Sequence, residues 1–248
     1  MDSYAISRVG FGKQVNEDFF GACVSADARV RFTAVADGMG GQAAGDVAGK
    51  LTITGFLDLA KEYRYKDEDS LEEFISDAVV KVSRMIEDEA AADPEKEGMG
   101  STIAVMALIE GENKAVLCNV GDSRVYCFRG GKLTQLTKDH SIAQLMLDKG
   151  YTREEIRKYL ATNAITKAMG FLSGSGPAGL PDTYTVDCRT GDIFMLCSDG
   201  LNSADDFELS AIFRENEHMS LETLCKELIK CALGYGSEDD ITAALVSI

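Results

Sequence analysis

The sequence predicts an α+β fold, in which two antiparallel sheets pack face to face and antiparallel helices cover their outer sides. The first observation behind this prediction is a set of short apolar or alternating segments, which is typical of strands. The second is that short turns containing glycine join several of these segments, and such turns allow only antiparallel pairing. The third is a set of amphipathic helical segments, each of which needs a sheet to cover. We therefore expect a four-layer α-β-β-α sandwich.

The expected strands begin near the N-terminus, dominate the middle of the chain and end it. They lie near residues 4–9, 18–24, 29–36, 101–110, 114–120, 123–129, 132–137, 183–188, 192–198 and 241–247. The hairpin turns are Glu110-Gly111-Glu112-Asn113, Arg129-Gly130-Gly131-Lys132 and Arg189-Thr190-Gly191-Asp192. Strands joined by such short loops pair as neighbours in one sheet.

Helices are expected over 43–63, 70–92, 206–215 and 220–233. In the second of these, apolar side chains recur at a spacing that places them on one face of a helix. They are Leu71, Phe74, Ile75, Ala78, Val79 and Val82. Such a stripe is typical of a helix that packs on a core, and we expect no ligand there.

The segment from about 139 to 180 differs from the rest of the chain. It contains short helical stretches at Ile142–Leu147 and Arg153–Leu160, followed by the loose, glycine-rich tract Leu172–Gly179. We expect one domain over residues 1–248, with this segment as a flap-like insertion beside the edge of the sheets.

The composition indicates a globular protein that does not bind nucleic acid. The 248 residues are 45% hydrophobic and 27% charged, with a formal net charge of −16 at pH 7. Such a charge would repel nucleic acid phosphates. No apolar run approaches the ~20 residues of a membrane span, and no leader pattern is present. We expect a cytoplasmic monomer that does not bind membranes.

Cysteine and histidine do not point to a metal site. The seven cysteines form no C-x-x-C pair, and most lie inside apolar strand-like runs. This pattern is typical of buried, reduced thiols. The chain has only two histidines, so a histidine-rich metal site is not expected either.

Aspartates stand at the ends of three apolar strand-like runs. Asp37 follows the run 32–36, Asp199 follows 193–197 after one serine, and the pair Asp239-Asp240 precedes 241–246. A carboxylate at the edge of a buried strand must be solvated or paired. Three of them at one edge would repel each other unless a multivalent cation lay between them, which predicts a hard-metal site with oxygen ligands.

These residues allow two other interpretations. Asp-Gly alone is common in ordinary turns. The run Gly38-Met39-Gly40-Gly41-Gln42-Ala43 resembles the dinucleotide-binding pattern, in which glycines approach a pyrophosphate. Asp37 would then place a carboxylate beside the pyrophosphate, and the antiparallel hairpins contradict the parallel sheet that this pattern requires. A nicotinamide-dependent oxidoreductase is therefore disfavoured.

Further motifs follow each other in a characteristic order. The set is Asn16-Glu17-Asp18, Ala36-Asp37-Gly38-Met39-Gly40-Gly41, Gly100-Ser101-Thr102, Asn119-Val120-Gly121-Asp122-Ser123-Arg124, Leu136-Thr137-Lys138-Asp139-His140-Ser141, Ile165-Thr166-Lys167-Ala168-Met169-Gly170, Ser198-Asp199-Gly200-Leu201 and Asp239-Asp240-Ile241-Thr242. With these motifs the chain resembles the metal-dependent type 2C serine/threonine protein phosphatases in their compact bacterial form. The resemblance covers nearly the whole chain.

The resemblance implies a β-sandwich between helical layers and a site with two manganese or magnesium ions. Asp37 would bridge both ions, and Gly38 would offer its carbonyl oxygen. Asp199 and Asp239 would hold the first ion. These three aspartates would be the catalytic residues.

The same resemblance assigns weaker roles to other acids. Glu17 and Asp18 would act mainly through metal-bound waters, and Asp122 would contribute to a third, weaker ion site. The segment 139–180 matches the flap of this family.

The implied activity is hydrolysis of phosphoserine and phosphothreonine in proteins. Two ions would share a water, lower its pKa and offset the charge on the phosphoryl oxygens. The implied partners are phosphorylated proteins and a cognate serine/threonine kinase. The alternative is a catalytically weak relative that binds phosphoproteins and regulates them.

The chain departs from the family pattern near the expected site. Lys13 stands where the family usually has an arginine that grips the substrate phosphate, and a lysine lacks the bidentate fork of arginine. Asp240 stands where asparagine is usual after the metal-binding aspartate, and the register against Ile241 favours Asp239 as the ligand. Met39 takes the place of a histidine that could act as a general acid in some members.

Overall fold

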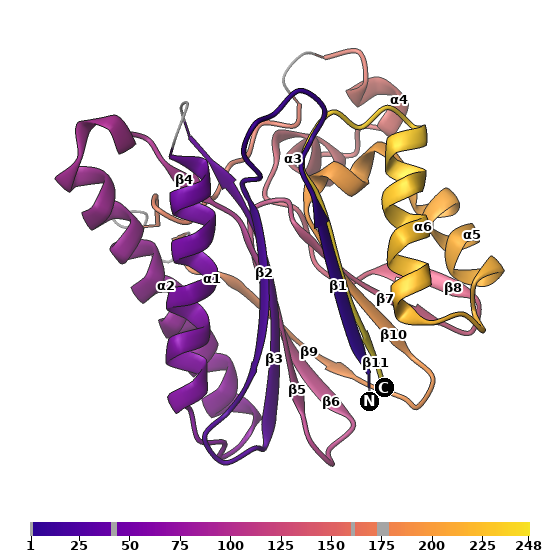
Figure 1. Ribbon diagram of the computed structural model, residues 1–248, viewed down its shortest axis with the longest axis horizontal. Coiled ribbons are helices and arrows are strands. Elements are labelled where there is room, and N and C mark those ends of the chain that lie inside the picture. Colours follow the sequence, from indigo (N-terminus) through magenta and orange to yellow (C-terminus); the bar gives the residue numbers. More distant parts are fainter. Residues whose placement is uncertain (1, 41–43, 160–161, 173–178) are drawn as a thin grey trace.

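The computed structural model shows two antiparallel sheets facing each other, with a layer of helices outside each (Figure 1). The structure describes residues 2–40, 44–159, 162–172 and 179–248. The predicted fold class, an α+β sandwich of antiparallel sheets flanked by antiparallel helices, is confirmed.

The first sheet has five strands and is covered by the C-terminal helices. Its order is β1 (Ser3–Arg8), β11 (Ile241–Ser247), β10 (Ile193–Cys197), β7 (Arg124–Arg129) and β8 (Lys132–Gln135). The helices outside it are α5 (Asp206–Glu215) and α6 (Leu221–Gly234), which pack against β8, β1 and β11.

The second sheet has six strands and is covered by the two long N-terminal helices. Its order is β2 (Asp18–Val24), β3 (Val30–Met39), β5 (Ile103–Ile109), β6 (Lys114–Val120) and β9 (Asp182–Asp187), and the short β4 (Gly100–Ser101) pairs with β3. Helices α1 (Gly45–Glu62) and α2 (Glu68–Ala92) lie outside it.

The alternation of side chains along the strands creates three cores. In β3, Phe32 and Ala34 face α1 and α2, whereas Val35 lies between the two sheets. Met195 of β10 likewise faces α5 and α6, and its neighbour Leu196 points between the sheets. A period of two residues therefore supplies both the middle core and the two outer cores.

Two element boundaries differ from the sequence prediction by three or more residues. Strand β3 does not stop before Asp37 but continues to Met39, because β4 supplies a pairing partner opposite Gly38 and Met39. The predicted helix Arg153–Leu160 is shorter: α4 ends at Ile156, and residues 160–161 lie outside the described part of the chain.

The flap-like segment contributes two short helices above the sheets, α3 (Ile142–Asp148) and α4 (Arg153–Ile156). Most of the glycine-rich tract, residues 173–178, and the predicted start of the first helix at residue 43 lie outside the described residues. Short 3₁₀ helices are formed by η1 (Pro94–Lys96) and η3 (Asp199–Ser203). In the described part of the chain, no helix is both long and apolar enough to cross a membrane.

Candidate metal centre

The strand ends at the upper edge in Figure 1 bring the predicted acids together. Asp18 and Asp37 are directly opposite each other in the β2–β3 pairing. Asp199 follows the end of β10 and Asp239 precedes the start of β11, and these strands are hydrogen-bonded neighbours. Asp122 lies in the turn between β6 and β7 at the same end. The antiparallel register therefore places acids that are far apart in sequence at one rim.

Asp37 is held through its backbone by the motif that contains Ser101 and Thr102. Its N–H donates to Thr102 Oγ1 at 3.0 Å, and its carbonyl accepts from Thr102 N at 2.8 Å and from Ser101 Oγ at 3.0 Å. Thr102 Oγ1 also lies 2.6 Å from Ser123 Oγ, beside Asp122. These contacts leave the carboxylate of Asp37 available and connect two of the acidic motifs.

Burial raises the pKa of these carboxyl groups. Burial is the largest cause for Asp37, whose pKa lies well above its usual value, and repulsion from Asp18 and Asp199 adds to it. Burial likewise raises the pKa of Asp18 to about 7, and that of Asp122 to about 7. Burial and the negative charge of Asp239 raise the pKa of Asp199. The rim is thus a site where negative charge is destabilised.

Several oxygens at the rim have no partner within the described residues. Oδ1 of Asp18, of Asp122 and of Asp199 is buried and accepts no hydrogen bond. The other carboxylate oxygen of Asp18 accepts from Ser198 Oγ at 2.6 Å. Buried carboxylate oxygens without donors are costly. A hard divalent cation among them would remove both the repulsion and the missing contacts, so the donor set fits manganese or magnesium.

The acids are close without forming a closed cage. The carboxyl groups of Asp37 and Asp199 lie within hydrogen-bond reach of one another. Across residues 2–40, 44–159, 162–172 and 179–248, however, no three His, Cys, Asp or Glu side chains already converge tightly enough to hold an ion. The described acids are therefore gathered at one rim without converging on a single point.

Glu17 and Gly38 meet where helix α1 begins. Gly38 N–H donates to the carbonyl of Glu17 at 3.0 Å. A Cβ on Gly38 would lie 1.9 Å from the carbonyl oxygen of Gly45, and one on Gly45 would lie 2.1 Å from Glu17 Oε1. Gly38 needs to be glycine because the backbone of the helix approaches the strand so closely, and a Cβ at Gly45 would displace the Glu17 carboxylate. This approach places the Glu17 carboxylate beside the backbone of Gly38.

Lys13 lies among the acids, and its ammonium forms ion pairs on the acidic side of the rim. Its Nζ donates to Asp239 Oδ1, lies 3.2 Å from Asp240 Oδ2 and lies 3.7 Å from Glu17 Oε2. Burial alone would lower the pKa of Lys13, but the hydrogen bond and charge of Asp239, together with Asp240, raise it above its usual value. Lys13 therefore carries a full positive charge at the rim.

Asp239 and Asp240 have different environments although they are adjacent. The Asp239 side chain is 48% exposed and lines the cleft at the rim, whereas that of Asp240 is 2% exposed. Asp240 Oδ1 accepts from Gly10 N at 2.7 Å, and Oδ2 accepts from Glu17 N at 2.8 Å. Both oxygens of Asp240 therefore hold the β1–β2 loop. The sequence alone did not reveal this role, because the partners are more than 200 residues away.

A partly buried arginine links the rim to the start of the flap-like segment. Arg124 donates from Nε to Asp139 Oδ1 at 2.9 Å and from Nη2 to Asp139 Oδ2 at 2.6 Å. His140 exchanges hydrogen bonds with Gly121, through Gly121 N to His140 Nδ1 at 3.0 Å and His140 N to Gly121 O at 2.9 Å. Burial is the main cause that lowers the pKa of His140. These contacts tie the turn of Asp122 to the segment that follows.

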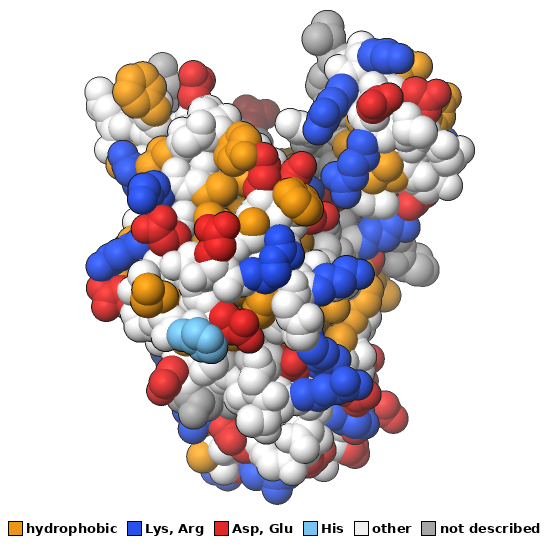
Figure 2. Space-filling view, turned by 90° about the vertical axis from the view of Figure 1, so that its right-hand side faces the viewer, with side chains coloured by type: hydrophobic (Ala, Val, Ile, Leu, Met, Phe, Trp, Pro, Cys, Tyr) orange, Lys and Arg blue, Asp and Glu red, His pale blue; other side chains and the backbone are white. Residues whose placement is uncertain are grey.

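A cleft of about 430 Å³ opens between the acids and the flap-like segment. Asp122, Asp199 and Asp239 line one side, and Arg153 and Arg157 of the segment line the other. In the space-filling view of Figure 2 the upper end of the molecule is hollowed between two raised parts. The cleft therefore combines carboxylates of the kind that bind metal ions with cationic side chains of the kind that bind anionic substrates.

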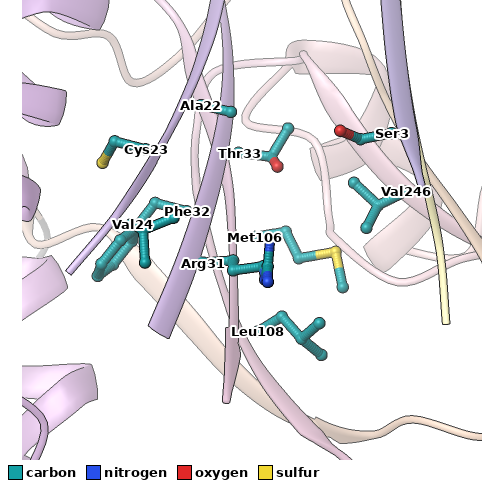
Figure 3. A pocket seen from close by; sticks show the side chains of 10 residues that line it. All are labelled: Ser3, Ala22, Cys23, Val24, Arg31, Phe32, Thr33, Met106, Leu108 and Val246. Carbon is teal, nitrogen blue, oxygen red and sulfur yellow. The ribbon is translucent and has the colours of Figure 1, made fainter. Parts of the chain in front are cut away.

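A second cavity, of about 170 Å³, lies between the sheets at the opposite end of the strands (Figure 3). It is lined largely by apolar side chains, with Arg31 as the charged group. No acid lines it among the described residues. The chemistry predicted from the aspartates therefore belongs to the rim and not to this cavity.

Comparison with known proteins identifies a matching family and several relatives of this chain. The family model described as protein phosphatase 2C matches residues 12–245. The chain is 34% identical over 215 residues to the serine/threonine phosphatase stp of Listeria welshimeri, covering 86% of this chain and 82% of that protein. The solved serine/threonine phosphatase of S. agalactiae superposes with a TM-score of 0.90 at 27% identity, covering 100% of this chain and 99% of the other.

A further solved structure includes metal ions. It is the catalytic domain of the serine/threonine protein phosphatase PstP, a protein known from Mycobacterium tuberculosis, in complex with two manganese ions. It superposes with a TM-score of 0.82 at 31% identity, covering 99% of this chain and 97% of the other. The two ions are a property of that protein.

Proposed function

The chain belongs to the protein phosphatase 2C family and is a hydrolase of that family, and from this premise we propose that it removes phosphate from phosphoserine and phosphothreonine in proteins. The single observation that carries the proposal is the rim of buried and partly buried acids. Asp37, Asp18 and Asp122 have raised pKa values, and several buried carboxylate oxygens there have no hydrogen-bond partner among the described residues. Such a rim is stabilised by divalent cations, and divalent cations are what phosphoryl transfer needs.

We assign the ligands by their position at the rim. Asp37 lies between the other acids and would bridge two ions, with the Gly38 carbonyl as a further ligand. Asp199 and Asp239 would complete the first ion site. When bound, the two manganese or magnesium ions would supply a shared water of lowered pKa as the nucleophile and offset the charge on the phosphoryl oxygens.

The remaining acids would act at a greater distance. Glu17 and Asp18 would hold metal-bound waters, because each carboxylate already has a protein partner: Lys13 Nζ lies 3.7 Å from Glu17 Oε2, and Ser198 Oγ donates to Asp18 Oδ2 at 2.6 Å. Asp122 would serve a third, weaker ion, together with Asp199 across the cleft. The motif residues Ser101 and Thr102 would keep Asp37 in place while the substrate binds and leaves.

Lys13 would meet the substrate phosphate. Its ammonium is charged and lies at the rim, but it is paired with Asp239 and Asp240. With Asp239 engaged as a ligand, Lys13 would lose part of that pair and would be free to turn toward an incoming phosphate. No protein nucleophile is needed for this reaction, since the attacking group is water.

The pairing of Lys13 also supports a second candidate function. A lysine held by Asp239 would compete with a metal ion for that carboxylate, which would lower turnover. The chain would then bind phosphoproteins and regulate them while hydrolysing them slowly. The retained Asp37, Asp199 and Asp239 favour the enzyme.

The proposed setting follows from the substrate class. Phosphorylated proteins would be the substrates, and a serine/threonine kinase would supply them by the reverse chemistry. We further propose a cytoplasmic monomer with one domain over residues 1–248, in which the segment 139–180 is a flap beside the cleft. Its arginines, Arg153 and Arg157, line the same cleft as the acids.

The test is hydrolysis of a phosphothreonine peptide with manganese, and with manganese plus a chelator. We expect turnover that requires the metal, together with calorimetric binding of two ions. Slow turnover with tight phosphopeptide binding would support the regulatory relative. A protein that binds neither manganese nor phosphopeptide would refute both functions.

A further inference from the structure

The loop between β1 and β2, residues 9–17, is anchored at both ends by one buried side chain. Asp240 Oδ1 accepts from Gly10 N at 2.7 Å, and Asp240 Oδ2 accepts from Glu17 N at 2.8 Å. Gly10 also packs closely on the segment before β11, because a Cβ there would lie 2.4 Å from the carbonyl oxygen of Glu238. The loop, at the upper edge in Figure 1, therefore has a defined position relative to the rim.

A tight turn within this loop separates two side chains. Lys13 N–H donates to the carbonyl of Gly10 at 3.3 Å, and Gly12 has a φ of +80°. A positive φ at the third residue of a four-residue turn is typical of a type II turn. Lys13 leaves this turn toward the acids of the rim. Phe11, at the second position, extends into solvent.

Phe11 is the most exposed large apolar side chain of the described residues. It is 85% exposed, and Val9 and Val15 in the same loop are 41% and 53% exposed. An aromatic ring in water gains free energy when a partner covers it. An anchored loop with three exposed apolar side chains is therefore a candidate contact surface.

The spacing between Phe11 and Lys13 determines which residues of a bound phosphopeptide can contact both side chains. Alternate Cα atoms are at most about 7.6 Å apart, because consecutive Cα atoms are separated by 3.8 Å. In an extended peptide, alternate residues are about 6.6–6.8 Å apart. A phosphorylated side chain at the rim would thus bring a residue one or two positions away in the peptide next to Phe11.

We propose that Phe11, supported by Val9 and Val15, is a substrate-specificity surface. It would favour phosphorylated segments that carry an apolar side chain within two residues of the phosphorylated residue. This inference rests on the proposed phosphatase function and names the substrate class of the same site.

The net charge of the chain favours a phosphorylated substrate segment at this surface over a second copy of the chain or an anionic membrane. The formal net charge of −16 makes a second copy of the chain a repelling partner, and it also disfavours an anionic membrane surface. A substrate segment, in contrast, is drawn to this position by the neighbouring phosphate site. The apolar loop and Lys13 belong to the same anchored segment, so both would contact the same ligand.

The test compares phosphothreonine peptides that differ only in one neighbouring residue, leucine or serine, at positions one or two before or after the phosphothreonine. We expect the wild-type protein to prefer the leucine peptide in at least one position by about fivefold to tenfold in kcat/KM, through KM. In Phe11→Ala this preference should fall to within about twofold, whereas Phe11→Leu should keep most of it. Met219→Ala is the matched control, because Met219 is 59% exposed and lies between α5 and α6, and it should keep the full preference.

A parallel measurement separates the failure of this inference from the failure of the proposed function. The same peptides are titrated by fluorescence anisotropy, with the leucine peptide expected to bind more tightly to wild type and not to Phe11→Ala. Active enzyme without a leucine preference, or with a preference that survives Phe11→Ala, would overturn the inference alone. Absence of manganese-dependent turnover would overturn the proposed function, while anisotropy would still decide the role of Phe11. Concentration-dependent self-association that Phe11→Ala abolishes would identify a second copy as the occupant and overturn the inference.

Discussion

Two buried aspartates at opposite ends of the five-stranded sheet have opposite electrostatic environments. Asp192, just before β10, is 2% exposed and is bound by Arg129 at 2.8 and 2.6 Å and by the N–H of Arg189 at 2.7 Å. Asp122, just before β7, is 6% exposed and has an oxygen without a hydrogen-bond partner in the described part of the chain. Burial would raise the pKa of Asp192, but the contacts with Arg129 outweigh it and lower the pKa; for Asp122, burial raises the pKa to about 7.

This difference distinguishes structural acids from functional ones. A buried carboxylate normally has donors or a cation that compensate its charge, as Asp192 has. At the upper rim, several buried carboxylate oxygens lack such partners among the described residues. Buried charge without compensation concentrates at functional sites, because a bound ligand supplies the opposite charge there.

The largest effect is expected from Asp37→Asn. Asp37 is the acid proposed to touch both ions, so its loss should reduce manganese-dependent hydrolysis to background and remove binding of both ions in calorimetry. Asp199→Asn and Asp239→Asn should reduce manganese-dependent hydrolysis almost as much. If Asp37→Asn kept about a tenth or more of wild-type activity, a loss under about 1.4 kcal/mol, the bridging role would be wrong.

The pH dependence of stability should reveal the uncompensated charge at the rim. Asp18 and Asp122 have pKa values raised to about 7 in the folded protein, against about 3.9 in an unfolded chain. Because the folded state binds these protons more tightly, stability is greatest below the unfolded pKa. It is lost as the pH rises through the folded pKa.

In chelator, the free energy of unfolding should therefore fall by a few kcal/mol between about pH 4 and about pH 7. Urea denaturation at several pH values measures this slope. Saturating manganese should remove most of it, since the cation offsets the same charges. A flat profile in chelator would mean that the rim acids are compensated by other groups.

Substitution of Lys13 tests how the rim binds the substrate phosphate. Lys13→Ala removes a charge-assisted contact of about 1.5–3 kcal/mol, mainly as a rise in KM for a phosphothreonine peptide. Lys13→Arg should bind phosphate at least as well as wild type, because the guanidinium can form two parallel hydrogen bonds. A change in kcat/KM of less than about twofold in Lys13→Ala would assign Lys13 to its ion pairs alone.

The smallest effects concern stability at the two ends of the sheet. Asp192→Asn should lower the free energy of unfolding by about 1–3 kcal/mol, because it weakens the contacts with Arg129. Asp122→Asn should leave the chelated protein equally stable or more stable, because it removes a buried charge that lacks compensation. Urea denaturation compares the two variants under one condition.

Asp122→Asn should also impair turnover while two tight ions remain bound. Loss of a tight ion in calorimetry would place Asp122 in the main site. Equal destabilisation by Asp192→Asn and Asp122→Asn would abolish the distinction between the two ends.

Most of the fold could be predicted because its signals are local. Period-two segments and glycine turns marked the strands, and apolar stripes marked the long helices, close to their observed bounds. The prediction was wrong where a boundary depends on a distant partner. Strand β3 extends to Met39 because β4 lies opposite. The helix predicted over Arg153–Leu160 was also too long, since α4 ends at Ile156.

The linear pattern indicates which segments become strands and helices, because side-chain periodicity and turn residues act over a few positions. It also places Asp199 and Asp239 beside the ends of strands, whereas Asp37 lies inside β3, two residues before its end at Met39. Which acids lose their compensation depends on the folded structure. It separated Asp240, which anchors the β1–β2 loop, from its neighbour Asp239. Burial and pairing of a charge depend on long-range contacts, and a linear pattern does not contain them.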